Sequence, residues 1–345
     1  MRISQATAIV EASIDSQIKY ATGRDAQRPI PYLVGGAGLG KTTTVTTLSD
    51  GKEGWAHYIL SLAQYDAGDI MGVIAMDNGK AVRLKPHWLS SVEELADTNK
   101  VVVLFLDELP QAPVSNQNVS AQLVNERRVG EFKLPDNVVL VAAGNRTSDR
   151  AGTNNMPSHL KDRLLFLEVE ADLEDTIAYY NSVGVSPLVT GFLRFRPELL
   201  HKFDRDANSC PSPRSWERVD TMMKWDIDPV NRQEAVAGQV GQGACAEFFG
   251  YKAVHDAVPD IDAVIANPDS APVAEDPAVC YAVSAALAHR ANDKNIGSIL
   301  KYMDRLPHKE FAVFTVKDAI NRHPDIKKTD AFRQFLLSRG KELML

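Results

Sequence analysis

The chain has 345 residues, 44% of them apolar and 24% charged, which suits a globular protein of two or three domains. Its formal net charge is −7, which disfavours broad, non-specific binding to nucleic acid. The three cysteines lie far apart without a C-x-x-C pair, so neither a zinc ribbon nor a redox pair is expected. No apolar stretch reaches membrane-spanning length and the N-terminus lacks the pattern of a signal peptide, so we expect a cytoplasmic protein.

The first half of the chain alternates short β-branched runs with helical stretches. Residues 1–28 predict a helix followed by a polar turn. The apolar runs that follow lie at 30–34, 57–62, 101–106, 138–143 and 164–169. Five such runs with helices between them predict a parallel β-sheet with helices on both faces, an α/β fold.

A glycine-rich motif follows the first of these runs. Residues 35–42 fit the pattern G-x-x-x-x-G-K-[ST] and lead into a predicted helix at 43–48. In this strand–loop–helix context the backbone N–H groups form a nest for phosphate. Lys41 is then expected to reach the β- and γ-phosphates, and the Thr42 hydroxyl to bind Mg²⁺. The predicted nucleotide-binding residues are Gly35, Gly36, Ala37, Gly38, Leu39, Gly40, Lys41, Thr42 and Thr43.

A second motif ends the wholly apolar run at 101–106, which predicts a buried central strand. Asp107 follows this run and is predicted to hold Mg²⁺. Glu108 comes next, where a carboxylate is placed to orient and activate the water that attacks the γ-phosphate. The residues between the two motifs leave room for one strand and an inserted hairpin at about 69–88, with its turn at 77–79.

After residue 171 the pattern becomes helical. Segments 172–183, 187–203 and 212–224 show apolar residues at helical spacing. A Pro- and Ala-rich polar stretch at 267–277 predicts a linker, and a last helical region follows from about 278. We therefore predict three parts: an α/β domain at 1–170, a helical lid at 171–266, and a linker with a helical region at 267–345.

The ordered motifs resemble the MoxR branch of the AAA+ ATPases over about residues 28–260. The resemblance lies in Leu106–Pro113, which is similar to the family's D-E-x-x-x-A-P text, in the following helix at 119–129 and in a hairpin-like segment at 130–136. It implies a P-loop NTPase core with a five-stranded parallel sheet, an all-α lid and a helical C-terminal region.

The resemblance also implies roles for three further residues. Asn145, at the end of the run at 138–143, matches the sensor-1 residue that polarises the attacking water. Arg163 matches the arginine finger that reaches the γ-phosphate of a neighbouring subunit, although Leu164 replaces the usual Phe; Arg146 and Arg150 are the alternatives. Arg214, within Ser212-Pro-Arg, matches the sensor-2 residue of the lid.

These expectations combine into an ATP- and Mg²⁺-dependent ring ATPase, which the resemblance makes a hexamer. Its client is expected to be a protein, and the resemblance suggests a von Willebrand A-domain partner. The segments at 66–90 and 129–137 are candidates to face the pore or the substrate.

Three other functions stay open from the sequence. A DNA-acting motor related to McrB would use the same nucleotide site, although the acidic charge disfavours it. A small-molecule P-loop kinase would lack the sensor residues and Arg163. A non-hydrolysing nucleotide switch is disfavoured because Glu108 is present.

Overall fold

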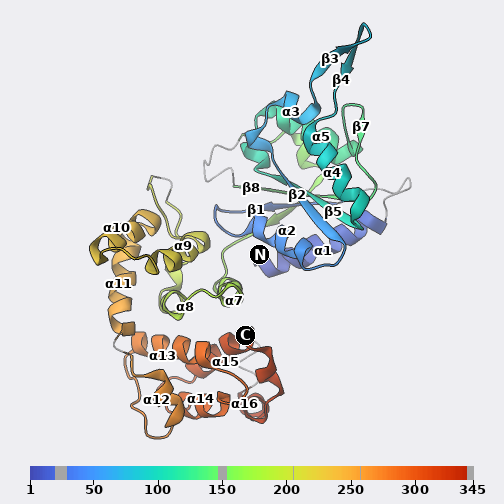
Figure 1. Cartoon of the computed structure of the whole chain (residues 1–345). Helices are drawn as coiled ribbons and strands as arrows, with labels where there is room; N and C mark the ends of the chain where they lie inside the picture. Colours follow the sequence, from blue (N-terminus) through green and yellow to red (C-terminus); the bar gives the residue numbers. More distant parts are fainter. Residues whose placement is uncertain (20–28, 147–153, 205, 257, 340–345) are drawn as a thin grey trace. The chain divides into compact units, whose positions relative to one another are not determined.

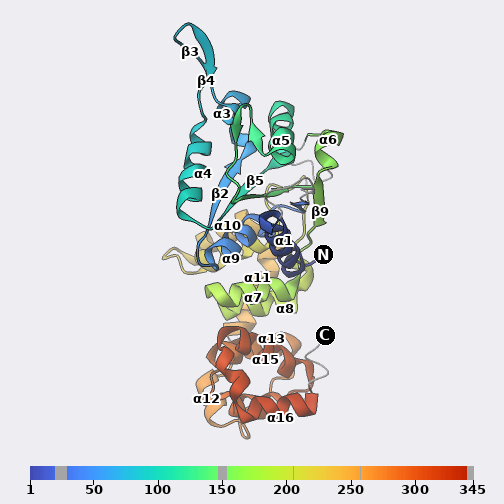
Figure 2. The ribbon, with the colours of Figure 1, turned by 90° about the vertical axis from the view of Figure 1, so that its right-hand side faces the viewer.

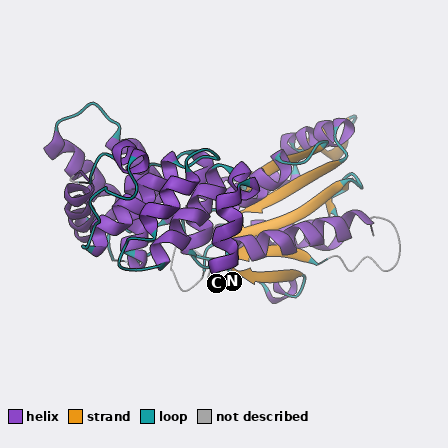
Figure 3. Cartoon of the chain, turned by 90° about the horizontal axis from the view of Figure 1, so that it is seen from below, coloured by secondary structure: helices purple, strands orange, loops and turns teal. Residues whose placement is uncertain are grey.

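The computed structural model describes residues 1–19, 29–146, 154–204, 206–256 and 258–339. The chain falls into two compact units, Met1–Glu170 and Ala171–Leu345. All described strands lie in the first unit, and the second is helical (Figure 3). No described helix has both the length and the apolar character needed to cross a bilayer.

The first unit is built on a five-stranded parallel sheet in the order β2-β5-β8-β1-β9. This confirms the predicted α/β core. The strands are β1 (Ile30–Val34), β2 (Trp55–Ser61), β5 (Val101–Asp107), β8 (Val138–Gly144) and β9 (Leu164–Glu168). The helices of this unit are α1 (Ile3–Lys19), α2 (Lys41–Asp50), α3 (Ala67–Met71), α4 (His87–Thr98), α5 (Val114–Glu126) and α6 (Ser158–Lys161).

Helices cover both faces of the sheet, with α1 and α2 on one side and α4 and α5 on the other (Figure 1). Because side chains alternate along a strand, Val102, Leu104 and Leu106 of β5 join the core formed with α4 and α5. The whole of β5 up to Leu106 is buried. This burial on both faces explains why the strand is apolar at every position.

A buried glutamine ties α1 to the centre of the sheet. Gln17 is 1% exposed, and its carboxamide donates Nε2 to Leu140 O and accepts from Leu140 N, both at 2.9 Å. Pairing between β8 and β1 begins two residues later, at Tyr32 opposite Ala142. The Gln17 side chain thus completes the backbone hydrogen bonding of β8 where no strand does so.

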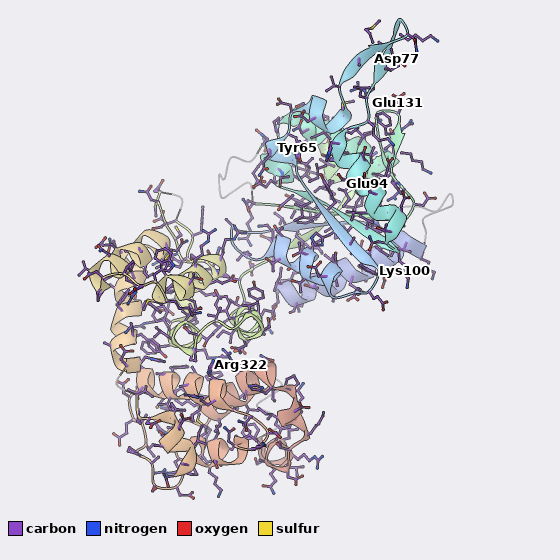
Figure 4. All side chains as sticks on the ribbon, viewed as in Figure 1. Tyr65, Asp77, Glu94, Lys100, Glu131 and Arg322 are labelled. Carbon is purple, nitrogen blue, oxygen red and sulfur yellow. The ribbon has the colours of Figure 1, made fainter. Side chains whose placement is uncertain are left out.

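The predicted insertion forms a hairpin of β3 (Ile74–Asp77) and β4 (Lys80–Arg83) (Figure 2). Asn78 and Gly79 make the two-residue turn, with φ of 49° and 77°. These positive values suit a type I′ turn, for which Asn-Gly is the preferred pair. Asp77 marks the end of the hairpin in Figure 4. A second, shorter hairpin pairs β6 (Arg128–Val129) with β7 (Phe132–Lys133).

The second unit consists of ten α-helices among its described residues. They are α7 (Leu173–Val183), α8 (Pro187–Phe195), α9 (Pro213–Met223), α10 (Pro229–Val240), α11 (Gln242–Asp256), α12 (Ile261–Ala266), α13 (Pro277–Arg290), α14 (Ile296–Met303), α15 (Glu310–Arg322) and α16 (Asp330–Arg339). The stretch between α12 and α13 holds no helix or strand, as its composition predicted.

The predicted helix at 187–203 is wrong beyond Phe195. A proline disfavours helical dihedrals in the residue before it, and Arg196, which precedes Pro197, has φ −130° and ψ 67°. A short 3₁₀ turn, Pro197–Leu199, follows.

A buried ion-pair network joins α8 to α7 and α15. Arg194 is 6% exposed, and its Nη2 and Nε lie 2.5 and 3.1 Å from the Asp318 carboxylate. Its Nη1 donates to Glu174 at 2.8 Å. Ala278 and Ala282 of α13 also pack into the core formed by α8, α9 and α11. The second unit therefore has continuous packing across the predicted boundary at residue 266.

Candidate functional site

The glycine-rich loop joins the end of β1 to the start of α2. Gly38 and Gly40 have φ of 77° and 82°, a region that residues with side chains rarely adopt. A Cβ added to Gly35 would lie 2.5 Å from Val169 O, so only glycine fits where the chain passes the end of β9. The strand, loop and helix thus follow the order predicted from the motif, and the loop opens directly onto a helix N-terminus.

Lys41 is held at the mouth of this loop. Its side chain is largely buried, and its ammonium donates to Gly35 O at 2.9 Å, Gly36 O at 2.8 Å and Asn145 Oδ1 at 3.1 Å. The ammonium thereby bridges the loop and the end of β8. Thr43, also predicted to line the site, is exposed in the first turn of α2.

Thr42 and Asp107 meet across the gap between α2 and β5. Thr42 Oγ1 donates to Asp107 Oδ2 at 2.9 Å, although 65 residues separate them in sequence. A hydroxyl and a carboxylate oxygen are ligands that Mg²⁺ prefers. The pair therefore fits the predicted metal site, and bound Mg²⁺ would supply charge neutralisation for phosphate oxygens there.

Glu108 follows Asp107 in an unusual backbone conformation. Its φ of 57° and ψ of 32° place it in the left-handed region, which disfavours a residue with a side chain by about 1–2 kcal/mol. Its N–H donates to Asp107 Oδ1 at 2.9 Å, so the same carboxylate is fixed from both sides. Strained backbone of this kind persists where surrounding contacts impose it, and it is frequent at functional sites.

Asn145 is positioned by a close approach that the sequence motifs did not reveal. A Cβ on Gly144 would lie 2.1 Å from Pro110 Cδ and 2.9 Å from the Tyr32 hydroxyl. Gly144 therefore lets the segment after Glu108 pack directly against the end of β8. The only sequence signal for this close approach was a glycine at the end of a buried strand, and glycine is also an ordinary turn residue at such a position.

Arg163 lies at the opposite end of the sheet from the loop. It immediately precedes β9, whose first residue, Leu164, pairs with Ile30 at the start of β1. The loop follows the other end of β1, five residues or about 16 Å along the strand. Arg163 Nε donates to Asn125 Oδ1 at 2.8 Å, and its Nη1 donates to His159 O. Arg163 therefore lies at the end of the sheet opposite the glycine-rich loop of the same chain.

The other two candidate finger residues are placed differently. Arg146 follows Asn145 and pairs with Glu168 at 3.0 Å and Glu170 at 3.6 Å. Two carboxylates of the same chain thus hold its guanidinium. Arg150 lies outside the described residues.

Arg214 is the second residue of α9 in the helical unit. Ser212 caps this helix, since its hydroxyl accepts from Ser215 N at 3.1 Å while the Ser215 hydroxyl accepts from Ser212 N at 2.7 Å. The predicted helix start is therefore present. The role of Arg214 at a phosphate stays a prediction.

One family of known domains matches part of the first unit. Residues 32–164 match the family model described as an AAA domain of the dynein-related subfamily. No curated protein matches the chain.

Two solved structures of RuvB variants from Thermotoga maritima are similar to the chain. They share 15% and 14% identity, cover 81% of this chain and 82% and 81% of theirs, and give TM-scores of 0.38 and 0.35. Likeness at this level does not bear on substrate or partner. The segment that matches the family model contains the whole glycine-rich loop, Asp107, Glu108, Asn145 and Arg163. Residues 32–164 are therefore an AAA domain of the dynein-related subfamily, a class of nucleotide-binding ATPase domains.

Proposed function

We propose that the chain is a Mg²⁺-dependent, ATP-hydrolysing ring protein of MoxR type that remodels a protein client. The observation that carries the ATPase proposal is the convergence of predicted residues from four elements. Lys41 contacts Asn145 at 3.1 Å, and Thr42 contacts Asp107 at 2.9 Å. These residues come from α2, the end of β8 and the end of β5, and the loop after β1 completes the set.

Each residue has a distinct task in this proposal. The loop N–H groups and Lys41 bind phosphate oxygens, and Thr42 with Asp107 holds the metal. Glu108, fixed beside Asp107, accepts a proton from the attacking water, which Asn145 orients. Arg163 stabilises the charge that develops on the γ-phosphate of a neighbouring subunit.

The ring is supported by the position of Arg163. Because Arg163 lies at the end of the sheet opposite the glycine-rich loop of its own chain, it can contact a γ-phosphate only if that phosphate is bound by a second copy of the chain. The MoxR type, the hexamer and a von Willebrand A-domain partner rest on the sequence resemblance alone.

The proposal is tested by phosphate release from Mg²⁺-ATP without any added acceptor. Glu108→Gln should bind ATP as tightly as the unaltered chain but hydrolyse it at least about 100-fold more slowly, because the base is lost. Lys41→Ala should lose ATP binding. Glu94→Gln, an exposed carboxylate on α4, is the matched control and should change neither property. Hydrolysis by Glu108→Gln at the unaltered rate would refute the assignment.

The client class is tested separately, since a DNA-acting motor would share the ATP site. ATP-dependent binding of duplex DNA that weakens steeply with salt would replace the protein-remodelling proposal with the nucleic-acid alternative. Capture of a protein by the Glu108→Gln variant only in the presence of ATP would support it.

A further inference from the structure

A basic cavity lies within the helical unit and shares no residue with the predicted nucleotide site. Its volume is about 480 Å³, and it is lined by the C-terminal ends of α7, α13 and α15. Asn181 of α7, His289 of α13, and Arg322 and His323 at the end of α15 face it. Figure 4 labels Arg322 on α15.

Arg322 is the permanent cation among the residues that line the cavity. Burial lowers the pKa of His289, and the nearby charges of Arg322, Arg290 and His323 lower it further. Arg322 donates Nη2 to Val185 O at 3.0 Å but forms no ion pair with a carboxylate of the described residues. The acid beside it, Asp318, is engaged by Arg194 through both oxygens.

Helix ends explain part of this arrangement. The C-terminus of a helix is partly negative, so a basic residue there is favourable without any ligand. Asn181 does not fit that explanation. It is 6% exposed and lines the cavity, and its Nδ2 makes no hydrogen bond to any described residue. A buried amide donor without an acceptor calls for an explanation, and an oxyanion bound beside the Arg322 guanidinium would supply that acceptor.

We propose that this cavity binds a phosphate dianion, either free or as the monoester of a small molecule. Arg322 is the main ligand, because a guanidinium can pair with two phosphate oxygens at once. His289, His323 and Asn181 supply further donors. A phosphate offers more acceptor oxygens than a carboxylate does, which matches one guanidinium with several neutral donors, and the volume suits a small ligand.

The test is an NMR titration of the 345-residue chain carrying ¹³C-labelled histidine. The His289 and His323 signals are assigned with His→Gln variants, so the readout is independent of the phosphate loop near Lys41. Inorganic phosphate and ribose 5-phosphate at constant ionic strength should shift both signals saturably, and acetate should bind at least about tenfold more weakly.

Variants of two arginines give the matched comparison. Arg322→Gln should weaken phosphate binding at least about tenfold. Arg305→Gln is the control, since Arg305 also donates to a backbone carbonyl, Pro268 O at 2.6 Å, but lies outside the cavity. The Arg305→Gln variant should bind phosphate as tightly as the unaltered chain does.

Three outcomes would overturn the proposal. The first is that chloride at equal ionic strength reproduces the shifts, and the second is that Arg322→Gln titrates normally. The third is that a single-stranded oligonucleotide binds more tightly than ribose 5-phosphate, which would favour a phosphodiester ligand. If Arg322→Gln does not fold, His323→Glu replaces it, because His323 is exposed and its imidazole makes no hydrogen bond or ion pair with the described residues. Unchanged binding by that variant would likewise contradict the proposal.

Discussion

Gly144 shows how a residue that touches no phosphate can control the site at the scale of single atoms. It allows Pro110 to pack against the end of β8, directly before Asn145. The contact leaves no room for a methyl group, and the next residue, Asn145, accepts a hydrogen bond from the Lys41 ammonium.

We expect Gly144→Ala to destabilise the first unit by about 1–3 kcal/mol, because the added Cβ would lie 2.1 Å from Pro110 Cδ. ATP hydrolysis should fall as Asn145 is displaced. Denaturant unfolding and phosphate release measure the two effects. Gly68→Ala in α3 is the control, since a Cβ there meets nothing within 4 Å. Full activity in Gly144→Ala would show that this contact does not align the site.

The sequence predicted most of the residues that converge in the structure, and it did so through spacing. Lys41, Thr42 and Asp107 belong to motifs whose residue order reflects the chemistry of phosphate and metal binding. Gly144 and the left-handed conformation of Glu108 could not be predicted, because both depend on how β5 and β8 lie side by side.

Individual elements were predicted well wherever local rules decide them. The Asn78-Gly79 turn needs only two residues that accept positive φ. β2 begins two residues earlier than predicted, because Trp55 and Ala56 pair with Val101 and Val102 on the neighbouring strand. That extension is a tertiary effect, which no periodicity along the segment itself reveals.

Asp220 of α9 contacts the start of α8, and this contact predicts how the stability of the fold depends on pH. Burial alone would raise the pKa of Asp220, but hydrogen bonds from Lys224 and Ser186 outweigh burial and hold it below its usual value. Asp220 Oδ1 accepts from Ser186 N at 2.9 Å, directly before α8 begins. A carboxyl group with a lowered folded pKa stabilises the fold above its unfolded pKa, about 4, and loses this effect as pH falls through the folded pKa.

Asp220→Asn should therefore lower the free energy of unfolding at pH 7 by about 1–2 kcal/mol. The difference from the unaltered chain should narrow as pH falls below about 4. Urea unfolding across this range measures both effects. Asp226→Asn, an exposed residue shortly after α9, is the control. A difference that stays constant with pH would indicate a packing effect instead.

At the scale of the whole molecule, the loop and Arg163 lie at opposite ends of one sheet. In a single copy of the chain, Arg163 would therefore not contact the phosphate bound at the loop. Arg163→Ala should bind ATP normally but hydrolyse it about 10³-fold more slowly or worse.

Mixing two inactive variants tests whether Arg163 acts between subunits. Lys41→Ala keeps Arg163 and lacks its own ATP site, whereas Arg163→Ala keeps the site. Equal amounts of the two should recover part of the phosphate release, because some interfaces then combine an intact loop with an intact arginine. Absence of any recovery in mixtures that do co-assemble would place Arg163 outside the shared site.

The helical unit yields a second prediction at this scale. Ending the chain after residue 266 removes Asp318, which leaves Arg194 buried with only Glu174, and removes Ala278 and Ala282 from the core. Breaking a buried ion pair by removing one partner costs about 3–5 kcal/mol. The shortened chain should show less helical circular dichroism than its predicted helices would give if folded. Residues 171–266 should also become sensitive to protease. A helical unit of unaltered stability in 1–266 would show that residues 171–266 fold alone.

The Gln17 carboxamide has a consequence for measurement. The Leu140 N–H donates to that side chain instead of to a strand, so its proton is shielded only while the first helix is seated on the sheet. Deuterium uptake at this one amide would therefore report how often α1 detaches from the sheet. Uptake at the neighbouring β8 amides would report the opening of the sheet itself.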